Sequence, residues 1–252
     1  MADICQLGLI GFPLGHSFSK NYFSSKFKRE GIQGWEYELY PLTHIEQLPE
    51  LLKSTKGLRG LNVTIPYKEA VIPYCTRLDP RAARIGAVNT LVLEEDGSIT
   101  GYNTDYLGFQ DSLKRWMGRS LDANVQALIL GTGGAAKAVQ VALEDSEIPF
   151  QYVSRKAQED IINYRMLHDR PDILGRHHLI INTTPLGMSP RIESFPDVPY
   201  SQLTSNHWLY DLVYNPSTTR FMTNGKARGA NTKNGLEMLQ LQAERAWEIW
   251  TR

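Results

Sequence analysis

The sequence lacks an excess of charge, a framework of cysteines and any long apolar run. Lysine plus arginine and aspartate plus glutamate both total 27 among 252 residues, so the formal net charge is zero. Without a net field, the chain as a whole does not attract nucleic acid or an anionic membrane surface. We therefore expect neither as a partner, and an anionic ligand must be bound by a local site.

Only two cysteines are present, Cys5 and Cys75. They lie far apart, each among apolar residues, which predicts buried reduced thiols rather than disulfides. The amino-terminal segment lacks the basic and apolar regions of a signal peptide, and no stretch approaches the roughly 20 apolar residues that span a bilayer. We therefore expect a cytoplasmic protein.

The histidines lack the spacing of a metal site. His168, His177 and His178 do not recur with cysteines or carboxylates in a pattern that would bind a metal ion. We expect these histidines at the surface and no metal cofactor. The sequence also has no internal repeats and no low-complexity segment.

Apolar runs alternate with amphipathic stretches through the first hundred residues, which predicts βαβ units around a mostly parallel sheet. The predicted strands are Ile4–Ile10, Trp35–Tyr40, Leu58–Val63 and Val88–Leu93. An Asp96-Gly97 pair, typical of a β-hairpin, joins the last of these to Ser98–Tyr102. We expect this antiparallel pair at the edge of the first sheet.

A second alternating series follows Thr104 and predicts a second α/β domain. Its elements are strand Val125–Leu130, helix Gly134–Asp145 and strands Phe150–Val153, His178–Asn182 and Trp208–Leu212. The stretch Ser189–Tyr200 is expected to be an exposed loop. The last helix, Gly235–Trp250, has one apolar face that predicts packing against a core. That face consists of Leu239, Ala243, Ala246 and Trp250.

A glycine-rich turn lies between a predicted strand and a predicted helix. The turn Gly131-Thr132-Gly133-Gly134-Ala135-Ala136 follows the strand VQALIL and opens the helix. Glycines let backbone approach a pyrophosphate, and the N–H groups and dipole of a helix N-terminus favour an anion. Glycines also form ordinary turns, so the flanking strand and helix are what favour a dinucleotide site.

The next strand ends in Ser154-Arg155-Lys156. A NAD-specific site would have Asp or Glu there to bind the ribose 2′-hydroxyl. Two cations and a hydroxyl suit a 2′-phosphate instead, so the sequence favours NADP as the cofactor. Without the glycine turn upstream, an ordinary solvated charge pair would explain these residues.

Four polar segments of the first domain lie at or near predicted strand ends: GFPLGHSFS at 11–19, NVTIPYK at 62–68, GAVNT at 86–90 and GYNTD at 101–105. The carboxyl ends of strands are where open α/β sheets bind ligands. Taken singly, their residues have structural explanations as helix caps, turn residues or a surface lysine. These residues are Ser17, Ser19, Asn62, Lys68, Asn89 and Asp105.

Together and in this order, the segments resemble the shikimate dehydrogenase family. Its members have Ser-x-Ser, N-V-T-x-P-x-K, G-A-x-N-T, N-T-D, a GxGGA turn and a closing helix that contains glutamine. Further matches are INTTPLGM at 181–188, DLVYNP at 211–216 and NGLEMLQLQA at 234–243. The resemblance covers nearly the whole chain. It implies an oxidoreductase that uses NADPH to reduce 3-dehydroshikimate reversibly to shikimate in aromatic amino acid biosynthesis.

The resemblance also implies a domain plan. An α/β substrate domain with a mixed, mostly parallel sheet is expected over 1–104, and a Rossmann-type NADP-binding domain over 105–234. The C-terminal helix, 235–252, returns to the first domain. The substrate is a small molecule bound between the domains, which open and close around it, and the chain is expected to be a monomer or homodimer.

Carried over residue by residue, the resemblance assigns proton transfer to Lys68, paired with Asp105. Hydride addition to a ketone creates an alkoxide, which needs a positive charge and a proton, and an ammonium group supplies both. The implied substrate residues are Ser17 and Ser19 for the carboxylate, and Asn62, Thr64, Asn89, Asp105, Tyr214 and Gln242 for the rest of the pocket. The implied cofactor residues are Gly131, Gly133, Gly134 and Ala135 at the phosphates, Ser154, Arg155 and Lys156 at the 2′-phosphate, and Leu212 and Gly235 at the nicotinamide.

The chain departs from the family pattern at Lys20, at Ser154-Arg155-Lys156 and at Glu237, and none of these departures removes a proposed catalytic group. One alternative is a quinate/shikimate dehydrogenase that uses NAD or NADP, against which the basic Arg155 and Lys156 argue. Another is an inactive homologue that senses ligands, against which the intact Lys68 and Asp105 argue. A third, a Rossmann reductase with a folate or tRNA-linked substrate, leaves the polar segments of the first domain without a role.

Overall fold

The structure is a computed structural model that describes residues 4–15, 18–122 and 124–252. Its contacts divide the chain into two compact units. Unit 1 comprises Met1–Thr104 and Gln242–Arg252, and unit 2 comprises Asp105–Leu241. The chain therefore leaves unit 1 once and returns to it for its last residues.

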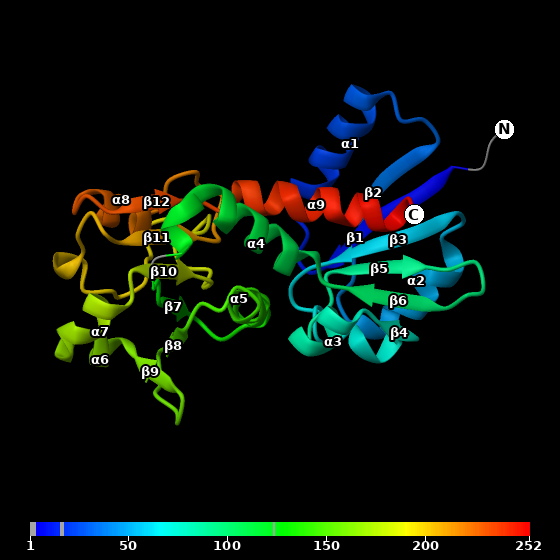
Figure 1. Cartoon of the computed structure of the whole chain (residues 1–252). Helices are drawn as coiled ribbons and strands as arrows, with labels where there is room; N and C mark the ends of the chain where they lie inside the picture. Colours follow the sequence, from blue (N-terminus) through cyan, green and yellow to red (C-terminus); the bar gives the residue numbers. More distant parts are fainter. Residues whose placement is uncertain (1–3, 16–17, 123) are drawn as a thin grey trace. The chain divides into compact units, whose positions relative to one another are not determined.

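Unit 1 is built on a six-stranded sheet in the order β2-β1-β3-β5-β6-β4 (Figure 1). The strands are β1 (Cys5–Gly11), β2 (Trp35–Pro41), β3 (Leu58–Val63), β4 (Arg77–Leu78), β5 (Thr90–Leu93) and β6 (Ile99–Tyr102). Among these described strands, β5 runs opposite to the other five, because it pairs antiparallel with both β3 and β6. The sheet is mixed and mostly parallel, as the sequence predicts.

The β5–β6 hairpin forms at the predicted turn, where Gly97 has a φ of 80°. The prediction that this pair lies at the edge of the sheet is wrong. The short strand β4 pairs parallel with β6 and takes the edge position, and β3 covers the other side of β5. A two-residue strand is too short for a period-two pattern, which explains why β4 could not be predicted from the sequence.

The two faces of the unit 1 sheet are covered by different helices. Helix α1 (Phe18–Glu30) and the end of α9 (Leu236–Trp250) pack on one face, against Leu7 and Leu9. Helices α2 (Leu48–Ser54) and α3 (Pro80–Ile85) pack on the other, where Ile10 and Leu61 point. Alternate strand residues thus enter alternate cores, as period-two geometry requires.

Unit 2 contains a fully parallel sheet in the order β12-β11-β10-β7-β8-β9. Its strands are β7 (Ala127–Leu130), β8 (Phe150–Ser154), β9 (Ile161–Asn163), β10 (Leu179–Asn182), β11 (Trp208–Asp211) and β12 (Asn231–Lys233). Counted within the unit this is the order 3-2-1-4-5-6, that of the Rossmann fold. The three-residue strands β9 and β12 have no counterpart in the sequence prediction.

Helices flank the unit 2 sheet. They are α4 (Thr104–Met117), α5 (Gly134–Glu144), α6 (Tyr164–Asp169), α7 (Pro171–Arg176) and α8 (Arg220–Lys226). Short 3-10 turns lie at Ile45–Gln47 and Ile72–Tyr74 in unit 1 and at Gly118–Asp122 and Tyr200–Gln202 in unit 2. Helix α4 packs on β11 through Trp116, whose ring lies 5.0 Å from that of Trp208 and 5.7 Å from that of Tyr210. Helices α6, α7 and α8 bury Leu167, Leu174 and Phe221 in a core with β7, β8, β10 and β11.

Several smaller predictions meet the structure differently. Ala243, Ala246 and Trp250 are buried, which confirms the apolar face of the last helix, although Leu239 is half-buried. Both cysteines are free but half-buried rather than buried, because Cys5 begins β1 at the end of the sheet and Cys75 follows a surface turn.

The histidines are also less uniform than predicted. His168 is exposed, but His177 and His178 are half-buried. Burial lowers the pKa of His177, whose Nδ1 lies 2.7 Å from the Ile173 carbonyl oxygen. Among the described residues, no group of three or more His, Cys, Asp or Glu side chains is placed to hold a metal ion. No described helix is long and apolar enough to cross a membrane.

Candidate active site

The polar segments of unit 1 meet at one edge of its sheet because of the direction of β5. The segments that follow β1, β3 and β6 lie at the carboxyl ends of parallel strands. GAVNT instead precedes β5, and since β5 is antiparallel, its beginning lies at that same edge. The register places Asn62 of β3 opposite Thr90 of β5, and Thr90 opposite Tyr102 of β6.

Asn62 is buried, and its amide group is fully used inside unit 1. Its Oδ1 accepts a hydrogen bond of 2.7 Å from the Tyr37 hydroxyl. Its Nδ2 lies 3.3 Å from the Asn89 carbonyl oxygen and 3.2 Å from the Thr90 hydroxyl. Because a backbone carbonyl only accepts, this contact fixes which end of the amide is nitrogen. Tyr37 must therefore donate to Asn62.

Tyr37 is a site residue that the sequence prediction missed. Its ring stacks on Phe23 at 4.7 Å, and the half-buried Ser19 of α1 lies beside its hydroxyl. No motif marks Tyr37, which lies in the middle of β2 and reaches the polar edge only because β2 pairs with β1.

Asn89 connects the cluster to the C-terminal helix. Its Oδ1 accepts from the Thr104 amide at 2.7 Å and from the Thr90 hydroxyl at 3.0 Å. Its Nδ2 donates to the Thr104 hydroxyl at 3.0 Å and to Gln242 Oε1 at 3.3 Å. The Thr104 hydroxyl lies 3.2 Å from the same Gln242 oxygen. Residues 153 positions apart thus share one hydrogen-bond network.

Lys68 lies in the turn after β3 and is half-buried. Its carbonyl oxygen accepts a 2.7 Å hydrogen bond from the Val88 amide, which ties the turn to GAVNT. Thr64 is also half-buried, and its backbone joins Ile10 and Tyr67 through hydrogen bonds of 2.9 Å. Ser17 lies outside the described residues.

The structure thus connects Asn62, Asn89 and Gln242 by hydrogen bonds within unit 1 and places Ser19 beside Tyr37, which bonds Asn62. The remaining two predicted substrate residues belong to unit 2. Asp105 is buried in the first turn of α4. Tyr214 is half-buried after β11, and burial raises the pKa of its phenol.

The glycine-rich turn of unit 2 follows β7, the central strand of the parallel sheet. Gly131 has a φ of 105°, a left-handed conformation that favours glycine, and a Cβ there would lie 2.9 Å from the Thr183 hydroxyl. Gly133 is the N-cap of α5 and a Cβ there would meet open space. Gly134 and Ala135 begin the helix. The turn therefore exposes the amide groups of a helix N-terminus, which suits a pyrophosphate.

The basic residues lie beside this turn. Strands β7 and β8 are parallel neighbours, and the Gly131 amide donates to the Val153 carbonyl oxygen at 2.8 Å. Directly after Val153, the Ser154 hydroxyl bonds the backbone of Lys156 at 3.0 Å and 3.3 Å, which folds the strand end into a turn. Arg155 is exposed, and among the described residues its guanidinium has no hydrogen bond or ion pair. Its position and availability fit a 2′-phosphate.

Leu212 and Gly235 meet at the end of β11. A Cβ on Gly235 would lie 2.2 Å from the Leu212 carbonyl oxygen, so a glycine is required for this approach. The Gly235 amide donates to the Val213 carbonyl oxygen at 3.2 Å. The two residues predicted at the nicotinamide are therefore in direct contact.

A buried cluster that the sequence prediction left without a role holds the loops around Leu212. Asp211 accepts hydrogen bonds from Asn182 at 2.9 Å, from the Val213 amide at 3.0 Å and from the Thr219 hydroxyl at 2.5 Å. Burial raises the pKa of Asp211 to about 6 although these three donors lower it. Asn182, Asp211 and Val213 belong to INTTPLGM and DLVYNP, and the polar residues Asn182 and Asp211 at the ends of buried strands could have indicated this cluster.

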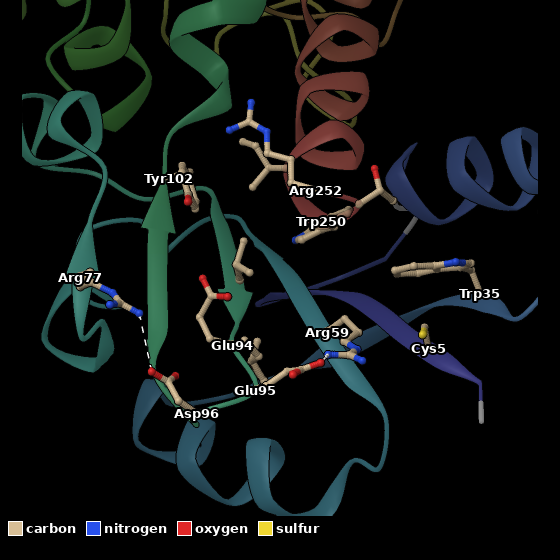
Figure 2. Close-up of a pocket in the computed structure, with 14 residues that line it drawn as sticks. Cys5, Trp35, Arg59, Arg77, Glu94, Glu95, Asp96, Tyr102, Trp250 and Arg252 are labelled. Atoms are coloured by element: carbon tan, nitrogen blue, oxygen red, sulfur yellow. Dashed lines mark ion pairs between the residues drawn. The ribbon is translucent and has the colours of Figure 1, made fainter. Parts of the chain in front are cut away.

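An open pocket elsewhere on unit 1 is distinct from these residues (Figure 2). It is lined by the beginnings of β1 and β2 and by the β5–β6 hairpin. Its arginines face acidic side chains, with Arg59 3.7 Å from Glu95 and Arg77 3.9 Å from Asp96. Its described lining includes none of the predicted site residues, so we do not assign the candidate active site there.

The parallel sheet of unit 2, with a glycine turn after its first strand, defines a dinucleotide-binding protein of the Rossmann class. Comparison with known proteins then identifies the family. Residues 9–91 match the family model described as the shikimate dehydrogenase substrate binding domain. A curated relative from Desulforamulus reducens, named shikimate dehydrogenase (NADP(+)), is 37% identical, and the match covers 97% of this chain and 89% of the relative. The chain belongs to the shikimate dehydrogenase family.

Solved structures agree with this assignment. Shikimate 5-dehydrogenase from Thermus thermophilus, in complex with NADP(H) and shikimate, is 30% identical with a TM-score of 0.83, over 98% of this chain and 94% of that one. Quinate dehydrogenase from Corynebacterium glutamicum, in complex with NAD, is 28% identical with a TM-score of 0.83, over 99% and 94%. The fold is therefore shared by dehydrogenases with different substrates and cofactors.

Proposed function

We propose that the chain is an oxidoreductase that reduces 3-dehydroshikimate reversibly to shikimate with NADPH. The observation that carries this proposal is the unit 1 cluster, in which three residues predicted to bind the substrate, Asn62, Asn89 and Gln242, are distant in sequence but form one buried hydrogen-bond network. Family membership and the relatives that are named for this activity support it.

The substrate is a small acid with several hydroxyl groups on a ring. Ser17 and Ser19 hold its carboxylate, and six residues contact the ring or line its pocket: Asn62, Thr64, Asn89, Asp105, Tyr214 and Gln242. In the described structure the side-chain amides of Asn62 and Asn89 hydrogen-bond other protein groups. The two residues therefore act chiefly by fixing the shape and polarity of the pocket. A pocket of preset polar groups discriminates strongly against a ligand that leaves them unpaired.

Lys68 is the proposed proton donor in the direction of reduction, with Asp105 as its partner. The reduced nicotinamide, when bound, supplies a hydride to the ring ketone. The Lys68 ammonium stabilises the developing negative charge on the oxygen and protonates it there. The backbone hydrogen bond from Val88 to Lys68 holds the lysine turn next to the polar cluster. A biosynthetic enzyme of this kind fits a cytoplasmic location.

NADP is the proposed cofactor. The residues that would hold it are Gly131, Gly133, Gly134 and Ala135 at the phosphates, Ser154, Arg155 and Lys156 at the 2′-phosphate, and Leu212 and Gly235 at the nicotinamide. Arg155 is exposed and makes no hydrogen bond or ion pair with the described residues, and it lies beside a turn that requires glycine, which supports a phosphate at this place.

The second candidate is a quinate or quinate/shikimate dehydrogenase that uses NAD. The similarity to the quinate dehydrogenase bound to NAD favours it, because the same fold serves that enzyme. Arg155 and Lys156 oppose it, since NAD has no 2′-phosphate for them to bind.

Spectrophotometric assays of the purified chain test the proposal, with shikimate or quinate paired with NADP or NAD in four combinations. We expect kcat/KM to be highest by far for shikimate with NADP. Equal or better turnover of quinate with NAD would favour the second candidate. Absence of turnover in all four, with binding of shikimate retained, would indicate a ligand sensor.

A further inference from the structure

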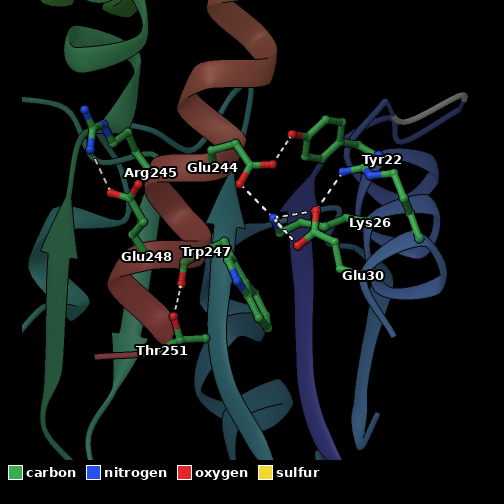
Figure 3. A network of polar contacts seen from close by, with 9 residues as sticks. Tyr22, Lys26, Glu30, Glu244, Arg245, Trp247, Glu248 and Thr251 are labelled. Atoms are coloured by element: carbon green, nitrogen blue, oxygen red, sulfur yellow. Dashed lines mark hydrogen bonds and ion pairs between the residues drawn. The ribbon is translucent and has the colours of Figure 1, made fainter. Parts of the chain in front are cut away.

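A buried lysine joins the two helices that cover one face of the unit 1 sheet (Figure 3). Lys26 of α1 is 5% exposed, and its Nζ lies 2.8 Å from Glu244 Oε2 of α9 and 2.9 Å from Glu30 Oε2. The Tyr22 hydroxyl donates to the other Glu244 oxygen. Both oxygens of the Glu244 carboxylate are therefore held by side chains of α1.

The lysine remains charged in this setting. Burial lowers the pKa of Lys26, but the hydrogen bonds that Lys26 donates to Glu244 and Glu30, with the negative charges of these carboxylates, outweigh burial and raise it overall. A buried ion pair generally adds less stability than apolar residues of the same volume, because both charges lose water. Its best-attested advantage is that it specifies one register of packing. A methionine at position 26 would suit the neighbouring Trp247 ring, so stability alone does not explain a lysine there.

The other contacts between α1 and α9 do not define register as sharply. Phe27 packs on Trp247 at 5.3 Å and Phe23 on Trp250 at 5.6 Å. Between the two helices these are aromatic contacts, and they recur at helical spacing along both helices. Trp250 Nε1 also donates to the Leu91 carbonyl oxygen at 2.9 Å, which ties the end of α9 to β5 rather than to α1. A shift of α9 by one turn, about 5.4 Å, would replace one apolar contact with α1 by another and would break the bond from Trp250 to β5. The same shift would leave Lys26 and Tyr22 without Glu244.

Register matters here because of the residue two positions before Glu244. Gln242 is the first residue of α9 that belongs to unit 1, and its Oε1 lies 3.3 Å from Asn89 Nδ2 and 3.2 Å from the Thr104 hydroxyl. These distances allow no displacement of an ångström or more. Helix α1 also carries Ser19, so the contacts of Glu244 with α1 join two helices that each carry a predicted substrate residue.

We propose that Lys26 and Glu244, with Tyr22, form a register lock that sets α9 along α1 and thereby holds Gln242 at the polar cluster. They are positioning residues, since they act on the substrate through Gln242. The inference rests on the proposed function, because it assigns Gln242 to substrate binding.

The first test is the Lys26→Met variant, which keeps length and apolar bulk but removes the charge. We expect KM for shikimate to rise roughly tenfold, a change of the size that coupling between residues of one network produces. The values of kcat and of KM for NADP should change less than about threefold. Lys28→Met, at an exposed lysine of the same helix, is the matched control and should match the wild type. Glu244→Gln, which retains an acceptor, should recover most of the shikimate affinity that Glu244→Leu loses.

The decisive test repeats Lys26→Met in a Gln242→Ala background. If the lock acts through Gln242, Lys26→Met should raise KM little or not at all there. A full additional tenfold rise would mean that Lys26 supports the unit generally, and an unchanged KM in the wild-type background would also overturn the proposal.

Failure of the proposed function would appear separately, as a wild-type chain without shikimate turnover. In that case hydrogen exchange still decides the structural part of the inference. Lys26→Met should accelerate exchange of the α9 amides around Gln242, and unchanged exchange would contradict the lock. If Lys26→Met does not fold, the comparison of Glu244→Gln with Glu244→Leu provides the same readouts.

Discussion

The polar edges of the two units use different chemistry. In unit 1 the side chains are buried and hydrogen-bond one another, so that Asn62, Asn89 and Gln242 each depend on residues from other strands or helices. In unit 2 the glycine turn presents backbone at the surface, and Arg155 and Lys156 are exposed. The hydroxyl groups of a ring are recognised by preset geometry, whereas a phosphate is recognised by charge, which acts over a longer range.

The largest effect is expected from Lys68, the proposed proton donor of unit 1, which acts by its charge. Lys68→Ala should lower kcat by roughly 10² to 10⁴ and leave KM for shikimate much less affected, because proton transfer occurs only in the transition state. Steady-state kinetics measure it, with Lys53→Ala at an exposed position of α2 as the control. A near-normal kcat with a raised KM would mean that Lys68 binds the substrate, like the polar residues of unit 1, and does not transfer the proton.

The buried cluster of unit 2 should respond to pH. Asp211 has its pKa raised by burial to about 6, against 3.8 in the unfolded chain. Its contribution to stability is therefore fully present below pH 3.8 and is lost as the pH rises through about 6. A shift of this size corresponds to about 3 kcal/mol.

The measurement is the free energy of unfolding of wild type and Asp211→Asn between pH 4 and 7.5. The advantage of the wild type over the variant should shrink as the pH rises across this range. The exposed Asp160→Asn substitution serves as the control. A difference that stays constant with pH would show that the three hydrogen bonds, rather than burial, determine the ionisation of Asp211.

Tyr37→Phe tests whether unit 1 depends on interlocked groups. The variant leaves Asn62 Oδ1 buried without its donor, which should lower the free energy of unfolding by about 1–3 kcal/mol. The matched control is Tyr74→Phe, because Tyr74 is half-buried in the same unit and makes no hydrogen bond with its hydroxyl among the described residues. Equal stability of the two variants would mean that Asn62 finds another donor and that the cluster is less tightly coupled than its geometry indicates.

Arg155→Ala tests recognition by charge in unit 2 and should have the smallest effect. Loss of a guanidinium should weaken NADP binding roughly ten- to a hundredfold, while Lys156 compensates in part, and KM for NAD should scarcely change. The assay compares kcat/KM for both cofactors at one moderate salt concentration, since exposed charges are screened. Arg165→Ala, at an exposed arginine of the same unit, is the control. A parallel loss with both cofactors would place the role of Arg155 outside the 2′-phosphate.

The sequence indicates the connections of the candidate site better in unit 2 than in unit 1. The glycine turn, its flanking strand and helix, and the basic residues after β8 lie between Ala127 and Lys156, so each could be recognised from local order. In unit 1 the same approach identified the segments but not their connections. Tyr37 lies in a strand without a motif, and the direction of β5 depends on its pairing with β3 rather than on its own residues.

The sequence alone indicates most of the strands and helices, although not β4, β9 and β12, together with the positions of glycine and turn residues and the polar residues available for a site. These features follow from periodicity and from backbone preferences, which act over a few residues. The tertiary structure alone decided that Tyr37 orients Asn62, that Gln242 reaches Asn89, and that Lys26 meets Glu244. Such contacts join residues 25 to 218 positions apart, and they exist only once sheet register and helix packing have fixed their distances.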